Sequence, residues 1–502
     1  MLTVTNSKIG GTAVIDPKGY DVVVVGAGNA ALLAALAAHE TGAKVLVLEK
    51  APRERRGGNS YFTGAGFRFS FRPEDASQLL SDVPESEREA MEWEGYTDDQ
   101  YYSDIMDISE GRIAPELATL VVKESLPTIR WMKSHGLQWE FRREDAMALK
   151  NGKIYIGSRV PWLRVKNRGV GLVNALFDIL QKKNIPVSYG TKAVRLVQDR
   201  KGQVSGLTLK TKEGFQDIDA KAVILACGGF EANQEMRLKY LGADWESIPI
   251  RGTQYNTGDG LRMALDIGAR PAGHWGGCHA AQVDVDAPEI ADPATTDEST
   301  RSGYQMGIIV NVNGKRFLDE GEDWRPFTYT KFARQVIQQP QRMAFQVIDS
   351  KMFAYLSGRY NRGSQVKAQS FEELAKGLEV DVDSFVQTVK EFNASVQPGI
   401  WDLAIKDGKK AVGISPPKSN WAMQIDTPPF YAFPTKAAIT FTFGGLKINT
   451  KGQVIDNEGE VIHGLFAAGE MVGFWHYRYM GGTGLMVGAV TGRIAGREAG
   501  TG

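Results

Sequence analysis

The sequence predicts an α/β protein in which a dinucleotide-binding domain is interrupted by a second domain of mixed α+β structure. A buried strand, a glycine-rich turn, a helix and another buried strand follow one another between residues 20 and 50. Apolar strand patterns with glycine turns return at 222–233 and at 441–502. We therefore expect the binding domain at 18–270 and 441–502, with an inserted cap or substrate domain at 271–440.

The glycine-rich turn has the residues and the context of a Rossmann-like dinucleotide-binding site. The apolar run 22–25 leads into GAGNAA at 26–31, a G-x-G-x-x-A turn that opens a helix of small residues. Gly26 permits the tight turn, and Gly28 lets the backbone approach a pyrophosphate, which the helix N-terminus attracts. Glu49 follows Gly28 by about 20 positions, where an acid accepts a ribose hydroxyl and disfavours the 2′-phosphate of NADP.

The composition excludes several classes of function. Among 502 residues, Lys+Arg and Asp+Glu both number 59, so no net charge attracts nucleic acid or anionic lipid. The two cysteines, Cys227 and Cys278, provide neither a disulfide framework nor a metal site, which fits a reducing compartment. The N-terminal residues, an irregular lead-in up to about 18, lack a signal-peptide pattern, and no apolar run is long enough to span a membrane. We expect a cytoplasmic protein without metal that is not integral to the membrane.

Two further segments fit a domain that binds a flat ligand. Residues 51–70 form a loop rich in arginine and glycine, in which Gly57, Gly58, Gly64 and Gly66 permit close backbone approach. Residues 186–226 change to strands of period 2 separated by Lys-Gly and Glu-Gly turns. Such an antiparallel insert is typical of glutathione reductase-like flavin folds, the two-dinucleotide-binding type.

Several motifs occur in an order that resembles the fumarate reductase/succinate dehydrogenase flavoprotein superfamily, from about residue 20 to the C-terminus. These motifs are GGNS (57–60), LACGGF (225–230), NTGDG (256–260), NGKRF (313–317) and GLFAAGE (464–470). Within the superfamily, RGGNS (56–60) and HYRYMGGTGL (476–485) are most similar to a soluble, tricarballylate dehydrogenase-like branch.

The resemblance implies FAD as the cofactor. Because the loop after Glu49 contains no histidine for covalent attachment, we expect FAD to be bound non-covalently. The last helix begins at Gly484 and Leu485, and its N-terminus is expected to face the N1 edge of the flavin. The expected cofactor residues are Gly26, Gly28, Asn29, Ala30, Glu49, Lys50, Gly57, Gly58, Asn59, Ser60, Thr63, Gly64, Gly66, Ala226, Gly228, Asp259, Gly469, Glu470, Gly484 and Leu485.

The family reaction transfers a hydride to or from flavin N5 and moves a proton through a side chain. By resemblance, Arg325 is the expected proton-transfer residue, served by the E-x-x-R pair of Glu298 and Arg301. An arginine has a reference pKa above about 12, so this role requires a relay as well as close contact with the substrate. The alternative interpretation is a surface salt-bridge cluster in an acidic loop.

The substrate residues depart from the family pattern. His279 matches the first carboxylate-binding histidine of fumarate reductases. Thr440 and Phe441 stand where that family has a second histidine, and Tyr479 with Met480 where it has an arginine. Candidate substitutes for the lost carboxylate ligands are His476 and Arg478, and Thr440 is expected to bind substrate. A plain fumarate site is therefore not expected.

Three functions remain open from the sequence. The first is an FAD-dependent dehydrogenase or ene-reductase acting on a CH–CH bond next to a carboxylate or carbonyl. The second is a 3-ketosteroid 1-dehydrogenase-like enzyme in which Tyr479 is the acid or base. The third is a non-catalytic flavoprotein electron carrier. Because the chain contains no haem-binding C-x-x-C-H motif and no iron–sulfur cysteines, we expect a small-molecule substrate and a separate electron donor or acceptor.

Overall fold

The main sheet is built on the two strands that flank the glycine-rich turn. The computed structural model describes residues 15–16, 19–80, 83–143, 148–150 and 153–502, so most of the expected lead-in lies outside the described residues. Strand β1 (Tyr20–Val25) lies between β2 (Val45–Glu49) and the end of β12 (Gly214–Leu225), parallel to both. Its valines are buried on both faces, as the continuous apolar run requires.

The C-terminal part of the chain returns to this sheet. Strand β19 (Val461–Ala467) pairs in parallel with β12 on the side away from β1, and β18 (Gln453–Ile455) pairs with β19. Strands β10 (Lys192–Gln198) and β11 (Val204–Thr211) join β12 as the predicted antiparallel insert. The sheet order is β10-β11-β12-β1-β2-β9, with β9 at Val187–Tyr189. An α/β binding domain with an inserted cap, the predicted fold class, is confirmed.

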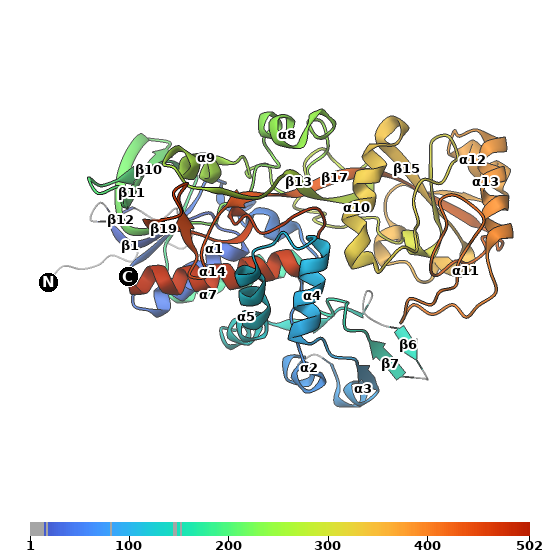
Figure 1. The fold of residues 1–502 in the computed structure, drawn as a ribbon, viewed down its shortest axis with the longest axis horizontal. Helices are drawn as coiled ribbons and strands as arrows, with labels where there is room; N and C mark the ends of the chain where they lie inside the picture. The colour runs from blue at the N-terminus through green and yellow to red at the C-terminus, as the bar shows by residue number, and fades with distance from the viewer. Residues whose placement is uncertain (1–14, 17–18, 81–82, 144–147, 151–152) are drawn as a thin grey trace.

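The two helices nearest the cofactor motif pack unusually closely. Helix α14 (Thr483–Thr501) lies beside α1 (Asn29–Glu40) below the main sheet (Figure 1), with α7 (Arg168–Lys182) on the same side. A side chain at Gly492 would overlap the carbonyl oxygen of Ala30, and one at Gly496 the carbonyl oxygen of Ala34. Glycines in α14 therefore let the two helix backbones touch, which fixes both helix N-termini at the same end of the sheet.

Two long antiparallel strands connect the binding domain to the cap. Strands β13 (Pro271–Asp284) and β17 (Phe430–Leu446) run side by side from the main sheet toward the cap in Figure 1. In the cap they form a sheet ordered β13-β17-β15-β14, with β15 at Met343–Asp349, β14 at Ile308–Asn311 and β16 (Val366–Ala368) paired to β17. Strand β17 continues without a break past residue 440, so the division of the chain at 440/441 stays a prediction.

Helices cover the cap sheet and the lower side of the molecule. Helix α10 (Arg325–Ile337) packs on β13, while α12 (Phe371–Gly377) and α13 (Val382–Ser395) enclose a separate apolar core. The remaining elements are α2 (Pro73–Leu79), α3 (Glu85–Glu89), α4 (Asp98–Ile108), α5 (Pro115–Ser134), α8 (Gln234–Leu241), α9 (Asp259–Asp266), α11 (Ser350–Phe353), β3 (Gly66–Phe67), β4 (Met91–Trp93), β5 (Trp139–Phe141), β6 (Ala148–Lys150), β7 (Lys153–Ile156) and β8 (Leu163–Val165).

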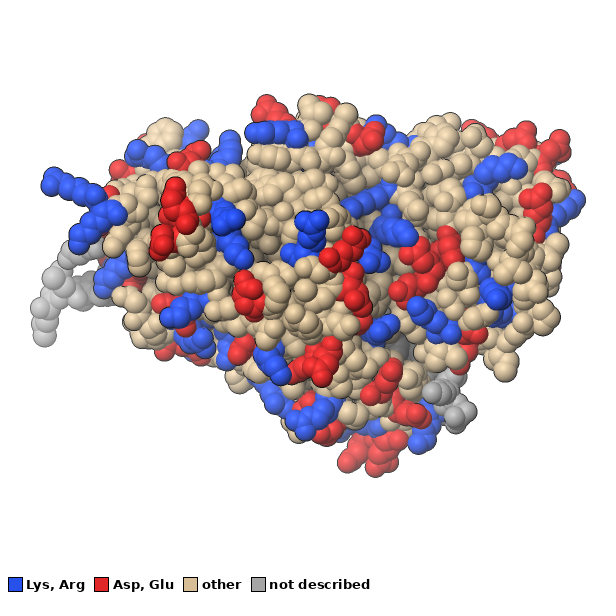
Figure 2. Space-filling model, in the orientation of Figure 1, with Lys and Arg blue, Asp and Glu red and all other residues tan. Residues whose placement is uncertain are grey.

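The surface and the helices agree with the balanced composition. On the face drawn in Figure 2, positive and negative side chains are interspersed without a large patch of one sign. Among the described residues, no helix is both long enough and apolar enough to cross a membrane.

The contact between α1 and α14 can be tested by adding one methyl group. Gly→Ala inside a helix is normally favourable, but in Gly492→Ala the new Cβ would overlap the Ala30 carbonyl. We expect a destabilisation of about 1–3 kcal/mol, seen as a lower midpoint of thermal unfolding. Gly358→Ala, at an exposed site with open space around the Cβ, is the control and should leave the midpoint unchanged. A Gly492→Ala midpoint equal to or above that of the unsubstituted protein would contradict this packing.

Candidate functional site

A single cavity of about 320 Å³ extends from the glycine-rich turn to the inner ends of the cap strands. It is lined by every predicted cofactor residue except Gly57. Gly57 has a left-handed backbone (φ 101°), and a Cβ there would lie 2.6 Å from Cγ1 of Val173. This glycine therefore lets the loop pack on α7, behind the cavity.

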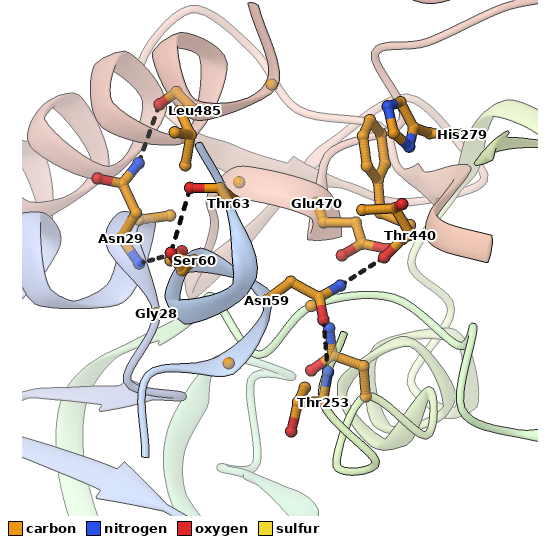
Figure 3. A pocket seen from close by; sticks show the side chains of 18 of the residues that line it. Gly28, Asn29, Asn59, Ser60, Thr63, Thr253, His279, Thr440, Glu470 and Leu485 are labelled. Carbon is orange, nitrogen blue, oxygen red and sulfur yellow. Dashed lines mark hydrogen bonds between the residues drawn. The ribbon is translucent and has the colours of Figure 1, made fainter. Parts of the chain in front are cut away.

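The glycine-rich turn, the loop 57–60 and the last helix are joined at one wall of the cavity. Gly26 has a φ of 107°, and a Cβ there would lie 2.5 Å from the carbonyl oxygen of Ala226, so only glycine fits. The Asn29 backbone N–H donates to Ser60 Oγ (2.9 Å), and the Asn29 side-chain amide donates to the Leu485 carbonyl (2.9 Å; Figure 3). The N-termini of α1 and α14 consequently face the same space, which suits an anionic ligand at both.

Glu49 provides a buried carboxylate at the far end of this wall. Its Oε1 accepts the Ala51 N–H (2.8 Å), and the side chain is almost fully buried. Burial raises the Glu49 pKa to about 7, although the backbone N–H of Ala51 and the Lys50 charge act in the opposite direction. A ligand hydroxyl that donates to Glu49 would favour the ionised form.

Asp259, at the start of α9, forms ion pairs with two lysines. Lys50 Nζ is 2.7 Å from Asp259 Oδ2, and Lys192 Nζ is 2.9 Å from Oδ1. Burial raises the pKa of this carboxyl, but the hydrogen bond and charge of Lys50, with Lys192, outweigh burial and hold the pKa below its usual range. Both Lys50 and Asp259 were predicted cofactor residues and both line the cavity.

The half-buried Glu470, which lines the cavity, is paired with the fully buried Glu231 behind it. Glu231, which the sequence interpretation missed, shares a hydrogen bond with Glu470 and accepts from the side-chain amides of Asn59 and Asn256 (both 2.6 Å). Burial, followed by mutual repulsion, raises the Glu470 pKa well above its usual value, and burial also raises that of Glu231. The pair therefore retains a proton. The available signal was an acid in the glycine-containing loop that follows a buried strand, at the strand end where ligands bind.

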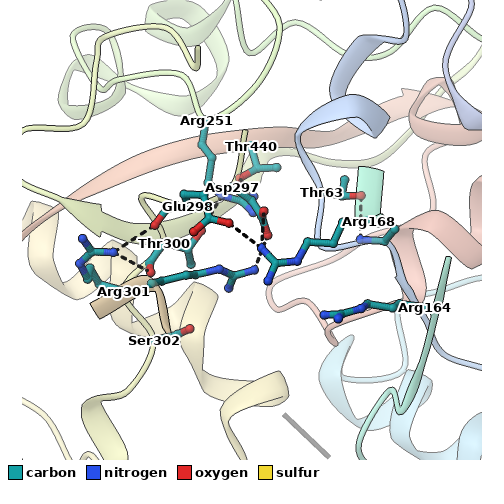
Figure 4. Close-up of polar contacts among 12 residues, drawn as sticks. Thr63, Arg164, Arg168, Arg251, Asp297, Glu298, Thr300, Arg301, Ser302 and Thr440 are labelled. Atoms are coloured by element: carbon teal, nitrogen blue, oxygen red, sulfur yellow. Dashed lines mark hydrogen bonds and ion pairs between the residues drawn. The ribbon is translucent and has the colours of Figure 1, made fainter. Parts of the chain in front are cut away.

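Three arginines gather around segment 297–302 at the inner end of the cavity (Figure 4 shows this segment). Arg359 forms an ion pair with Asp297, and Arg325, at the N-terminus of α10, donates to Ser302 Oγ (3.4 Å). Burial raises the Asp297 pKa, but Arg359, Arg251 and Arg168 outweigh burial and lower it. Asp297 is consequently ionised and compensates for one of the three cations.

Arg251 differs from Arg359 in that its guanidinium is held by hydroxyl groups. Its Nε donates to Thr300 Oγ1 (3.1 Å), and its Nη1 donates to Thr440 Oγ1 (3.3 Å). Within the described part of the chain, no carboxylate forms an ion pair with it. Burial lowers its pKa, and the nearby Asp297 charge acts against this shift. The sequence interpretation missed Arg251 because no local motif marks it.

Aromatic rings form another part of the wall of the inner cavity, centred on His279 of β13. The His279 ring stacks on Phe441 (centroids 4.9 Å apart, 13° between planes) and meets the edge of Tyr479 at 4.6 Å. His279 Nε2 and the Tyr329 hydroxyl lie 2.5 Å apart. Tyr479 Oη accepts the Gly484 N–H (2.9 Å), so this hydroxyl lies at the N-terminus of α14. His279, Tyr479 and Thr440 were predicted to lie at the substrate, and all three line the cavity.

The ring side carries no charge. Burial, followed by the charges of Arg251 and Arg334, lowers the His279 pKa well below its usual value, so His279 is neutral at pH 7. Burial raises the pKa of Tyr329 and of Tyr479, so both hydroxyls keep their protons.

Four predicted catalytic or substrate residues are not brought to the cavity. Arg301 is buried and donates to Asp284 (2.7 Å) and to the Arg362 carbonyl (2.6 Å), while Glu298 accepts from Arg168 (2.8 Å). His476 stacks on His274 with the centroids 6.4 Å apart, and Arg478 donates to the Asp107 carbonyl (3.0 Å). Of the predicted catalytic and substrate residues, the structure thus gathers Arg325, Tyr479, His279 and Thr440 in one place.

The comparisons with known proteins agree with this geometry. A family model described as an FAD binding domain matches residues 21–485. The chain is 28% identical over 494 residues to the probable fumarate reductase Ifc3 of Shewanella frigidimarina, covering 95% of this chain and 74% of that protein. It is 27% identical over 516 residues to vinyl phenol reductase of Lactiplantibacillus plantarum, covering 96% of each. The open conformation of a flavocytochrome c3 fumarate reductase superimposes with a TM-score of 0.71 at 26% identity, covering 96% of this chain and 78% of that one.

The chain therefore belongs to this FAD-binding family, within the fumarate reductase/succinate dehydrogenase flavoprotein superfamily, and is an FAD-dependent oxidoreductase. Its own residues fit the cofactor. The glycine turn leaves room for a pyrophosphate between two helix N-termini, and Glu49 is placed for ribose hydroxyls. The buried Oδ1 of Asn29 has no hydrogen-bond partner within the described residues, which leaves an acceptor for a ligand donor.

The buried Glu49 predicts a pH dependence of FAD binding. Without FAD its pKa is about 7, above the ordinary value of 4.5. The folded protein therefore binds this proton between those values, and the contribution of Glu49 to stability falls as the pH rises through that range. Ribose hydroxyls need the ionised form, so FAD affinity should fall about tenfold per unit below about pH 7 and level off above it.

The measurement is quenching of FAD fluorescence on binding, followed between about pH 5.5 and about pH 8.5. Glu49→Gln should bind more weakly at pH 8 and lose most of this pH dependence. An equal pH dependence in the two proteins would show that another group is responsible.

Proposed function

We propose that the protein is an FAD-dependent dehydrogenase or ene-reductase of the CH–CH class, acting on a bond next to a carboxylate. The observation that carries the proposal is Arg251. It is a cation in the same cavity as the FAD residues, held by two hydroxyls, and no carboxylate of the described residues forms an ion pair with it. A largely buried charge is costly without a counter-ion, so a substrate carboxylate is the natural partner.

Each inner residue has a part in this proposal. When bound, FAD exchanges a hydride at its N5 position with one carbon of the substrate. Arg251 holds the carboxylate, with Thr300 and Thr440 fixing its guanidinium. Arg325 moves the proton at the second carbon, a role supported by its place at the start of α10 and in the lining of the cavity.

Arg301 and Glu298 contribute by position rather than by contact with substrate. Arg301 Nη1 donates to the backbone carbonyls of Glu298 and Thr300 (both 3.2 Å). Arg301 therefore fixes the segment against which the arginines of the cavity lie.

A second candidate function is favoured by one observation. Tyr479 lines the cavity, and its hydroxyl lies at the N-terminus of α14, where a phenol can act on the carbonyl of a ketone substrate such as a 3-ketosteroid. This alternative leaves Arg251 without a counter-ion, so we place it second. A non-catalytic electron carrier, the third possibility, would need neither residue.

The finer parts of the proposal concern the cofactor and the partners. We propose non-covalent FAD, a separate electron donor or acceptor, a cytoplasmic location, and a substrate related to those of the tricarballylate dehydrogenase-like branch by its carboxylate. The many hydrogen bonds that already join the cavity walls support cofactor retention without a covalent bond.

Non-covalent attachment has a simple test. Acid precipitation of the FAD-loaded protein should release the yellow chromophore completely into the supernatant. Colour that stays with the washed pellet would contradict non-covalent binding, because only a covalent bond survives denaturation.

Substitutions of Arg251 and Arg325 should impair different steps, substrate binding and turnover respectively. The probe is the acid among fumarate, tricarballylate and cinnamate that perturbs the flavin spectrum most. Arg251→Gln should weaken its binding at least about 30-fold, which corresponds to about 2 kcal/mol for a buried charge pair. Arg325→Ala should lose turnover by at least about 100-fold while binding FAD and acid nearly normally.

Arg362→Gln is the matched control, because the Arg362 side chain is 74% exposed and lies outside the cavity. All three variants should retain FAD. If Arg251→Gln binds the probe as tightly as the control does, the carboxylate is not at Arg251 and the proposed function loses its support.

A further inference from the structure

Charged and aromatic side chains occupy different sides of the inner cavity. The arginines lie along segment 297–302, where Arg251 reaches Thr300, Arg359 reaches Asp297 and Arg325 reaches Ser302. The rings lie around His279 instead. A ligand that fills the space therefore meets cations at one end and rings at the other.

The two ends are one residue apart along β17. Thr440 accepts the hydrogen bond from Arg251, and the next residue, Phe441, carries the ring that stacks on His279. Thr440 and Phe441 both line the cavity, at a point where the pairing of β13 with β17 is irregular. A short ligand can consequently touch the Arg251 guanidinium and the ring cluster at the same time.

The rings around His279 offer a second carboxylate neutral hydrogen-bond donors but carry no positive charge themselves. His279 is neutral, and the hydroxyls of Tyr329 and Tyr479 keep their protons. The nearby cation Arg334 donates to the backbone carbonyls of Cys278 and Tyr477 (2.9 Å for Tyr477) and does not line the cavity. A second carboxylate buried there would meet neutral hydrogen-bond donors without a cation, which compensates its charge less well than the Arg251 end does.

Aromatic side chains favour another aromatic ring over an aliphatic chain. Phe441, Tyr479 and Trp475 all line the cavity, and Trp475 meets Tyr479 edge to face at 4.9 Å. Offset stacks and edge-to-face contacts of this kind are open to a flat, conjugated ligand ring.

We infer that the substrate is an arylacrylate or its saturated arylpropionate counterpart. Its single carboxylate binds Arg251, and its ring lies among Phe441, Tyr479 and Trp475. This inference rests on the proposed function. In the reducing direction the substrate C=C bond gains one hydride from reduced FAD and one proton from a side chain, giving the saturated acid and oxidised FAD. A separate electron donor then restores reduced FAD.

The test is an anaerobic titration of the FAD-loaded protein, followed by flavin absorbance. The ligands are cinnamate, crotonate, fumarate, tricarballylate and 4-androstene-3,17-dione. Cinnamate should bind at least about tenfold more tightly than crotonate, which has the same acrylate but no ring, and more tightly than fumarate. This comparison needs no variant, so it holds even where a substitution disturbs folding.

Variants then separate the two ends of the ligand. Phe441→Leu should weaken cinnamate about tenfold and leave crotonate unchanged, whereas Arg251→Gln should weaken both. Phe215→Leu, at a side chain that is 70% exposed and remote from the cavity, is the control and should change neither.

The outcomes distinguish this inference from the proposed function. Fumarate, tricarballylate or crotonate binding as tightly as cinnamate, with all acids sensitive to Arg251→Gln, overturns the arylacrylate class and leaves the proposed function standing. Binding of the steroid alone, or acid binding that is indifferent to Arg251→Gln, overturns both.

Discussion

The hydrogen bonds of the Asn59 side chain are the contact on which the rest of the site depends. Its amide nitrogen donates to Glu231 Oε1 and to the Thr440 carbonyl (both 2.6 Å), and its oxygen accepts the Thr253 N–H (2.9 Å). One side chain thus joins the cofactor loop to the loop after β12, to the segment after Arg251 and to β17. Buried networks of this kind are strong when every group is satisfied and costly when one is lost. A side chain at the adjacent Gly252 would overlap Asn59, which explains a glycine at that position.

The parts of the protein that local pattern encodes could be predicted from the sequence. The apolar run of β1, the turn at Gly26 and the acid at Glu49 lie within one short segment, so their spacing already fixes the strand-turn-helix-strand unit. The antiparallel insert and the return of the chain to the sheet could also be predicted, because each is encoded by a local pattern of strands and turns. Gly57 could not be assigned, because a glycine required by helix packing looks the same in sequence as one required by a ligand.

The substrate end could be predicted only in part, because it forms from segments far apart in the chain. Arg251 and Glu231 carry no local motif, and their importance depends on what lies opposite them in space. Arg301 was predicted to serve proton transfer because the E-x-x-R pair resembles that of the family. In the structure the buried Asp284 carboxylate of β13 needs a cation, and Arg301 supplies it. In the same way, Glu298 is paired with Arg168 from another segment. Charge compensation in three dimensions therefore decides which of several candidate charges remains for a ligand.

The proposed function depends on one arrangement, in which FAD and a substrate carboxylate share a cavity and Arg251 is the cation that binds the carboxylate. Arg359, another arginine of the cavity, is already paired with Asp297. The His279 ring on the aromatic part of the wall is neutral and does not attract a carboxylate by charge. The most direct measurement is a crystal structure of the FAD-loaded protein with cinnamate bound. We predict a carboxylate oxygen within about 3 Å of the Arg251 guanidinium, with the ring beside Phe441. A carboxylate bound elsewhere, with Arg251 turned to a protein acid, would contradict it.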